Sequence, residues 1–188
     1  EVAALMTARG EGLFRAARQA VAAGRIGAPV LAFGQKSYPF AHRGELYKRR
    51  ETYGGSIPWA AIHALDFVRW TAGQGYTRVA AMHANTAHPS HPGMEDNGGL
   101  LLGLSGGGHA VISFDYLRPW GKAERPWADD RLRLAGTEAA LEVVAAEGRA
   151  VLIAPDGEEA LPAADEADIF AEFAAALRGD GERFITTT

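Results

Sequence analysis

The segment from residue 56 to residue 72 is apolar on almost every side, and it restricts the fold more than any other part of the chain. Ser56 and Pro58 suit the first turn of a helix, with the Ser56 hydroxyl as N-cap, and Gly73 suits its end. A helix that is apolar all round has to be buried, so each polar group on it needs a partner. We therefore expect His63 and Asp66 to mark either a site or a fully paired position in the core.

The spacing of this helix places His63 among aromatic side chains. Residues three or four positions apart share a face, and that face carries Trp59, His63, Asp66, Phe67 and Trp70. An imidazole changes charge near neutral pH and can act as a general acid or base. The alternative is a hydrogen-bonded core histidine. Asp66, one turn further on, would either orient the ring or cap a neighbouring strand.

The rest of the chain reads as short strands with helices at the two ends. Helical spacing occurs at 13–23 and again from Asp165 to Gly179, and short apolar runs at 2–7 and from Val30 predict strands. Six further runs, separated by turns, occupy residues 79–82, 99–104, 110–114, 131–135, 140–144 and 150–153. In Arg131-Leu-Arg-Leu, alternation puts the arginines on one face and the leucines on the other. This pattern predicts one α+β domain over residues 1–188, with a largely antiparallel open β-sheet and helices packed on one face.

Composition excludes several classes of partner. The 188 residues carry a net charge of −4 and the pI is about 5.9, so no basic face for nucleic acid is expected. No apolar run is long enough to span a membrane. We therefore expect that the protein does not bind membranes. The chain has no cysteine, which excludes disulfides and thiolate chemistry. The sequence starts at Glu1 without a methionine, so its location is left unknown, with the cytoplasm as the default expectation.

Two loop regions carry candidate ligand-binding groups. The polar stretch 38–52 holds Tyr38, Arg43 and Tyr47, and Arg118 follows a predicted strand end. Such side chains suit the hydroxyls or the carboxylate of a small molecule, although a solvated loop would have the same composition. The histidines and acids of residues 83–96 have the spacing of neither a helix nor a strand, so we expect a surface loop and no metal there. The Gly103–Gly108 cluster predicts a hairpin turn and not a dinucleotide loop.

Four motifs in order give the chain a family resemblance. They are Gly24-Arg-Ile-Gly-Ala-Pro-Val30 with Arg9 upstream, Gly54-Gly55 followed by His63 and Asp66, Phe114-Asp-Tyr-Leu-Arg-Pro119, and Asp129-Asp-Arg-Leu-Arg-Leu-Ala-Gly136. Over residues 2–185 the sequence resembles the second domain of the glucose–fructose oxidoreductase, inositol dehydrogenase and MocA family. The first domain of that family binds a nicotinamide coenzyme. The resemblance implies that this domain precedes the present sequence, with residues 1–8 as its last strand.

The resemblance also implies a function. It indicates the substrate-binding and oligomerisation domain of an NAD- or NADP-dependent dehydrogenase that oxidises a CH–OH group of a sugar or polyol, inactive without its coenzyme domain. His63 would be the catalytic acid–base. The substrate-binding candidates are Trp59, Asp66, Tyr38, Arg43, Tyr47 and Arg118. A homo-oligomer would form through the open face of the sheet.

One departure keeps a second reading open. Members of the family usually carry an aspartate four residues before the histidine, where this chain has Trp59. An indole cannot polarise an imidazole as a carboxylate does, but it can stack on a sugar ring. The alternative function is therefore a non-catalytic module on the same fold, for binding a sugar-type ligand or for assembly.

Overall fold

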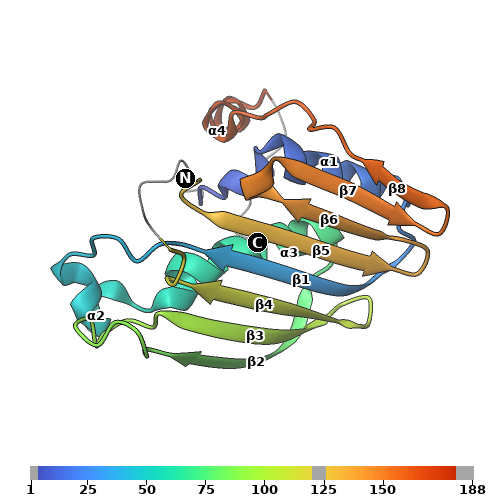
Figure 1. The fold of residues 1–188 in the computed structure, drawn as a ribbon. Helices are drawn as coiled ribbons and strands as arrows, with labels where there is room; N and C mark the ends of the chain where they lie inside the picture. The colour runs from blue at the N-terminus through green and yellow to red at the C-terminus, as the bar shows by residue number, and fades with distance from the viewer. Residues whose placement is uncertain (1–3, 120–125, 181–188) are drawn as a thin grey trace.

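An open sheet of eight strands, in the order β2-β3-β4-β1-β5-β6-β7-β8, forms the framework of the computed structural model, which describes residues 4–119 and 126–180 (Figure 1). The strands are β1 (Pro29–Ser37), β2 (Tyr76–Ala84), β3 (Asn97–Leu104), β4 (His109–Asp115), β5 (Asp129–Gly136), β6 (Ala140–Val144), β7 (Arg149–Ala154) and β8 (Gly157–Ala160). Only β1 and β4 pair in parallel, and every other pair of neighbours is antiparallel.

The two long helices of the first half, α1 (Gly12–Ala22) and α3 (Ile62–Ala72), lie side by side on one face of the sheet (Figure 1). α3 contacts β1, β4 and β5, and α1 contacts β6 and β7. The predicted α+β class, with a mostly antiparallel sheet, is confirmed. Shorter pieces complete the chain: the 3-10 helices η1 (Thr7–Arg9), η2 (Glu45–Lys48) and η4 (Ala145–Glu147), the short helix α2 (Arg50–Tyr53) and the π-helical turn η3 (Ile57–Ala61).

The start of the apolar helix differs from the prediction. Ser56 makes no side-chain cap, because its hydroxyl donates to the backbone oxygen of Glu95. The carboxylate of Glu95 instead accepts from the backbone N–H of Ser56 at 2.8 Å. Arg50 pairs with the same carboxylate. The helix therefore takes its N-terminal acceptor from a loop 39 residues further along the chain, which local sequence does not reveal.

α3 packs directly on the centre of the sheet because β1 has a glycine, Gly34, at the point of contact. A Cβ added to Gly34 would lie 2.6 Å from Val68 Cγ2 and 2.8 Å from Ile112 Cδ1. Phe67 is fully buried beside Val68, and its ring lies 4.8 Å from that of Phe14 on α1. This close approach fixes the height of α3 above β1.

The alternation predicted for β5 is confirmed. Leu132 and Leu134 are 2% and 0% exposed on the helix-covered side, whereas Arg131 and Arg133 lie on the other side. The same alternation on β1 turns Ala32, Gly34 and Lys36 toward the helices. Lys36 is thus a charged residue in a row of core positions.

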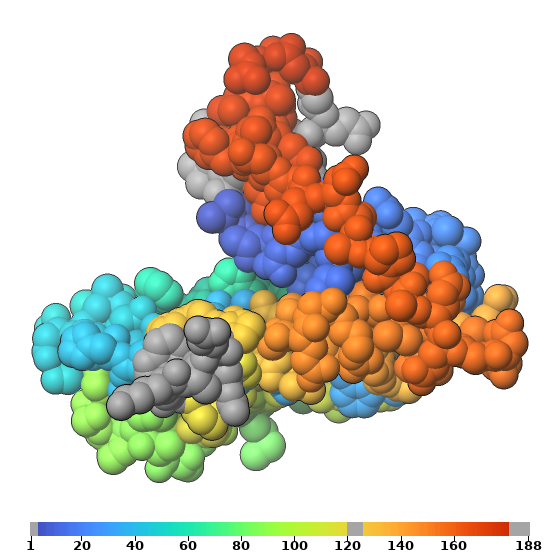
Figure 2. Space-filling view, turned by 45° about the horizontal axis from the view of Figure 1, so that its top comes forward, coloured from blue at the N-terminus to red at the C-terminus, as the bar shows by residue number. Residues whose placement is uncertain are grey.

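The C-terminal region corrects one predicted boundary. The last helix, α4 (Ile169–Arg178), begins after Asp168, whose carboxylate caps it, and not at Asp165. The chain before it runs along Gly10 and Gly12, whose carbonyls accept from Ala167 and Ala164. α4 buries no residue and stands away from the sheet in Figure 2.

At the other end, the strand predicted at 2–7 lies partly outside the described residues. Residues 4–6 have no regular structure, and Thr7 already belongs to η1. None of the helices in the described ranges combines the length and the apolar character that crossing a bilayer requires.

The contact at Gly34 gives a stability prediction. Gly34→Ala forces a methyl group against Val68 and Ile112, so we expect the free energy of unfolding to fall by about 1–3 kcal/mol in urea denaturation. Gly44→Ala is the matched control, because the space around Gly44 is open and its φ of −78° suits alanine. Equal stability of the two variants would contradict the packing described for α3.

Candidate active site

Lys36 and Asp130 face each other across β1 and β5 on the helix-covered side of the sheet. Lys36 Nζ lies 2.5 Å from Asp130 Oδ2, and the two side chains are only 6% and 9% exposed. The other oxygen of the carboxylate, Oδ1, is buried and has no hydrogen-bond partner among the described residues. A charged pair is therefore held in the core with one acceptor atom unused.

His63 of α3 is close enough to this pair to be affected by its charges. The ring is partly buried and forms no hydrogen bond with the described residues. Burial lowers the pKa of His63, and the Lys36 ammonium lowers it further, whereas Asp130 and Asp66 act in the opposite sense. The imidazole is therefore neutral at neutral pH and able to accept a proton.

The carboxyl groups nearby respond to the same environment. Burial raises the pKa of Asp130, and the Lys36 ammonium offsets only part of this. Burial also raises the pKa of Glu11, just before α1, and Asp130 adds to it. Burial lowers the pKa of Lys36, but Asp130 and Tyr38 together outweigh it, so the pKa lies above its ordinary value and the amine stays protonated.

Asp66 is hydrogen-bonded neither to the His63 ring nor to a strand end among the described residues. Its Oδ2 accepts from Arg9 Nε at 2.9 Å and its Oδ1 from Arg9 Nη2 at 2.5 Å. Both groups are 11% exposed, and the forked pair ties η1 to α3. Asp66 thus holds the segment before α1 against the helix that carries His63.

Three of the predicted substrate-binding residues belong to one aromatic cluster. Tyr47 lies 5.8 Å from Trp59, and Tyr53 lies 5.6 Å from Trp59. The Arg43 guanidinium lies 5.0 Å from the ring of Tyr47, and Trp59 is 46% exposed. Trp59, one turn before His63, therefore offers a free edge or face to solvent beside the histidine.

Tyr38 connects this cluster to the charged pair. Its ring lies 4.8 Å from Lys36 Nζ and 6.1 Å from the ring of Tyr116. The Arg43 guanidinium lies 4.5 Å from that same Tyr116 ring. A series of aromatic rings, bridged by the Arg43 guanidinium, thus leads from Trp59 to Lys36.

Arg118 is not brought to His63. Its Nη1 pairs with Asp129 Oδ2 at 3.1 Å, and Arg131 binds the same carboxylate. Asp129 precedes Asp130 on β5, so its side chain points to the opposite face of the sheet. The pairing of Arg118 with Asp129 follows from the tertiary fold and not from the local sequence.

The histidines of residues 83–96 serve to order their loop. His88 Nδ1 lies 3.2 Å from Asp96 Oδ2, and the His88 ring stacks on Phe40 at 3.8 Å. His91 Nε2 contacts the backbone oxygen of Arg43 at 2.9 Å. Among the described residues, no group of three or more metal-binding side chains is present.

Sequence reasoning missed Lys36, Asp130 and Glu11. A usable signal existed for the first two, because Lys36 has the strand parity of Ala32 and Gly34, and Asp130 has that of Leu132 and Leu134. A charge at an inward strand position needs an opposite partner, and the antiparallel register supplies it. Register, however, follows from the tertiary fold.

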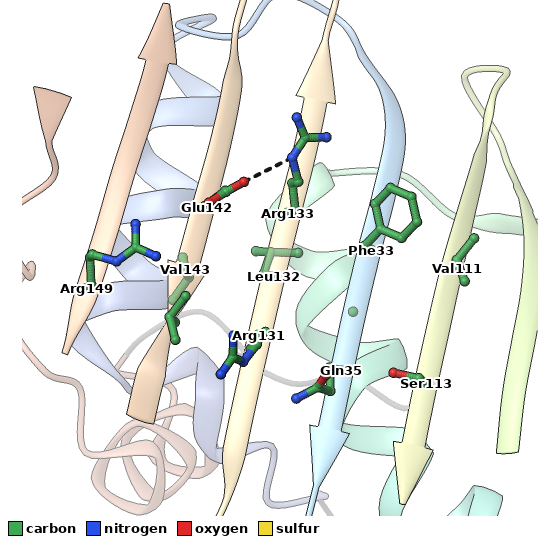
Figure 3. A pocket seen from close by; sticks show the side chains of 12 residues that line it. Phe33, Gln35, Val111, Ser113, Arg131, Leu132, Arg133, Glu142, Val143 and Arg149 are labelled. Carbon is green, nitrogen blue, oxygen red and sulfur yellow. Dashed lines mark hydrogen bonds and ion pairs between the residues drawn. The ribbon is translucent and has the colours of Figure 1, made fainter. Parts of the chain in front are cut away.

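The uncovered face of the sheet has its own hollow, of about 360 Å³ (Figure 3). Leu101, Val111 and Phe33 form a cross-strand row there, and Arg133 continues it on β5. Phe33 and Leu101 are 42% and 52% exposed. In Figure 3 the Arg133–Glu142 ion pair borders this hollow.

Comparison with known proteins identifies the family to which this fold belongs. Residues 14–142 match the model of the GFO/IDH/MocA C-terminal domain. The chain therefore belongs to the GFO/IDH/MocA family. No curated protein sequence matches it.

Solved structures extend the comparison. A Thermotoga maritima protein assigned to the oxidoreductases is 34% identical with a TM-score of 0.92, over 98% of this chain and 55% of its own. A similarly assigned protein from Erwinia carotovora is 26% identical with a TM-score of 0.80, over 96% of this chain and 57% of its own. An Azotobacter vinelandii inositol dehydrogenase homologue, solved with NADH and myo-inositol, shares the fold at 16% identity and a TM-score of 0.66, over 86% of this chain and 42% of its own. The chain thus spans about half the length of these proteins.

The low pKa of His63 predicts how stability depends on pH. In the unfolded chain the ring takes up a proton as the pH falls through about 6.5, while the folded ring resists it until a lower pH. We expect His63 to lower the free energy of unfolding as the pH falls from 7.5 to 5.5, by at most about 1.4 kcal/mol per pH unit for one proton.

Urea unfolding of the wild type and of His63→Gln at both pH values isolates this contribution. The wild type should lose more stability on acidification than the variant. An identical loss in both would show that the ring titrates alike in the folded and unfolded states.

Proposed function

We propose that this chain is the substrate-binding part of an NAD(P)-dependent oxidoreductase that acts on a sugar or polyol, with His63 as the catalytic base. The observation that carries the proposal is the neutral imidazole beside the Lys36–Asp130 pair, in a chain of this oxidoreductase family. A neutral imidazole can take the proton of a substrate hydroxyl. The crystallised homologue with NADH and myo-inositol supports the substrate class.

The aromatic cluster supports a ring-shaped, hydroxylated substrate. Trp59 is half exposed one turn before His63, and its indole Nε1 is occupied by the backbone oxygen of Tyr53. The indole is thus fixed in orientation, with part of its surface free to pack against the C–H face of a sugar or cyclitol. Tyr38, beside Lys36, contributes a hydroxyl at the other end of the cluster.

The coenzyme is proposed to bind to a part of the protein outside this sequence. The described residues hold no glycine-rich loop that joins a parallel strand to a helix, and the Gly103–Gly108 stretch forms the hairpin between β3 and β4. These residues do not fit a dinucleotide. We therefore assign to this chain the substrate and the proton, and leave the redox group to the remaining half of the protein.

We further propose that a second copy covers the uncovered face of the sheet. The apolar row Leu101–Val111–Phe33 is open to solvent, and the neighbouring Arg133 and Glu142 supply charges of both signs. A two-fold axis through such a row would bring apolar side chains together and leave the charged groups to pair at its rim.

Replacement of the base tests the enzymatic proposal. In the full-length protein with its coenzyme domain, His63→Ala should lower kcat for the polyol substrate by about 10²- to 10⁴-fold, because proton transfer loses its acceptor. Steady-state kinetics over a panel of neutral sugars and cyclitols, beginning with myo-inositol, measures the effect. His42→Ala, at an exposed loop histidine, is the matched control and should leave kcat unchanged. Equal turnover in both variants would favour a non-catalytic binding module.

A charge on the open face tests the assembly. Phe33→Asp should raise the dissociation constant of the oligomer by about 30-fold or more, because two carboxylates would be buried in the apolar row. Light scattering coupled to size-exclusion chromatography measures the change in mass with concentration. Phe170→Asp is the control, since Phe170 is 73% exposed on α4 and remote from the row. An unchanged oligomer in Phe33→Asp would show that this face is not the interface.

A further inference from the structure

Burying the ion pair of Lys36 and Asp130 costs free energy, and the fold does not require this pair. Both side chains are more than nine-tenths buried, and burying two charges costs more in lost hydration than their attraction usually returns. Replacement of a buried ion pair by apolar side chains of similar volume is often neutral or stabilising. We therefore look for a function of this pair other than stabilising the fold.

The pair also leaves some of its hydrogen-bonding groups without a partner among the described residues. Asp130 Oδ2 binds Lys36, while Oδ1 is buried and has no partner in the described parts of the chain. Lys36 Nζ carries three N–H groups, of which one is directed to Oδ2 while the Tyr38 ring lies 4.8 Å away. One carboxylate oxygen and at least one N–H thus have hydrogen-bonding capacity that the described side chains do not use.

The groups around the pair come from every element that packs on it. They are Glu11 before α1, His63 on α3, Tyr38 after β1 and Asp129 on β5, while Asp66 on α3 acts on His63 and is bound by Arg9 of η1. The carboxyl groups of Glu11 and Asp130 share the nearby Lys36 ammonium. A phosphate or carboxylate ligand would meet repulsion here, whereas neutral hydroxyls can both donate to the oxygen and accept from the ammonium.

We propose, resting on the proposed function, that Lys36 and Asp130 are catalytic residues that hold two adjacent hydroxyls of a neutral substrate. The free Oδ1 of Asp130 accepts a hydrogen bond from one hydroxyl. Lys36 Nζ donates to the oxygen of the other, which is the reacting one. When that O–H bond breaks, its proton moves to the His63 ring and its electron pair stays on the oxygen, where the Lys36 ammonium stabilises the alkoxide.

The test replaces both charges at once, because a single replacement would leave an unpaired buried charge and could unfold the chain. In the full-length protein, Lys36→Met with Asp130→Leu should keep the circular dichroism spectrum and lower kcat/KM for myo-inositol by about 100-fold or more, mainly through kcat. The matched control is Glu45→Leu with Lys48→Met, which removes a solvent-exposed pair and should change kcat/KM by less than about 3-fold.

A second measurement does not depend on turnover. In the wild type, saturating myo-inositol should shift the NMR signals of the ¹³C-labelled His63 ring, and in the folded double variant this shift should be lost. A folded double variant that keeps both kcat/KM and the shift overturns the catalytic role of the pair while the proposed function stands. A wild type that neither oxidises myo-inositol nor shows the shift overturns the polyol function, and the role of the pair with it.

Discussion

The packing of α3 on β1 is the contact on which the rest of the structure depends. Gly34 leaves room for Val68 and Phe67 to reach the sheet, so the helix lies low over the middle strand. His63 stands on the same helix, five residues before Val68, and this height brings it within electrostatic reach of Lys36 and Asp130. A core contact with no chemistry of its own therefore decides which groups meet at the site.

The charged groups are placed by two different kinds of element. Lys36 and Asp130 come from facing positions of adjacent strands, where the hydrogen-bonded ladder fixes their separation. His63 comes from a helix, and Asp66 on that helix is bound by Arg9, which keeps η1 in place beside it. Strand register and helix docking are both rigid constraints, and this is the condition for a preorganised site. The exposed aromatic side chain of Trp59 borders the site from η3, the turn that precedes α3.

Local sequence predicted the elements well where a single physical rule governs them. The alternation of Arg131 and Arg133 with two leucines was sufficient to orient β5, and the apolar segment around His63 identified a buried helix. Rules that involve a distant partner failed. Ser56 was expected to cap its helix, but Glu95 does so from another loop, and the local sequence did not reveal that Arg118 pairs with Asp129.

The sequence by itself determined the α+β class, the buried helix with its histidine and the family to which the chain belongs, because these depend on periodicity and on motifs within short segments. Only the tertiary structure decided that Lys36 and Asp130 lie near His63 and that Glu11 lies near this pair, because residues 11, 36, 63 and 130 meet through strand register and helix docking. The physical reason is that a charge interaction depends on distance in space, whereas a sequence records only distance along the chain.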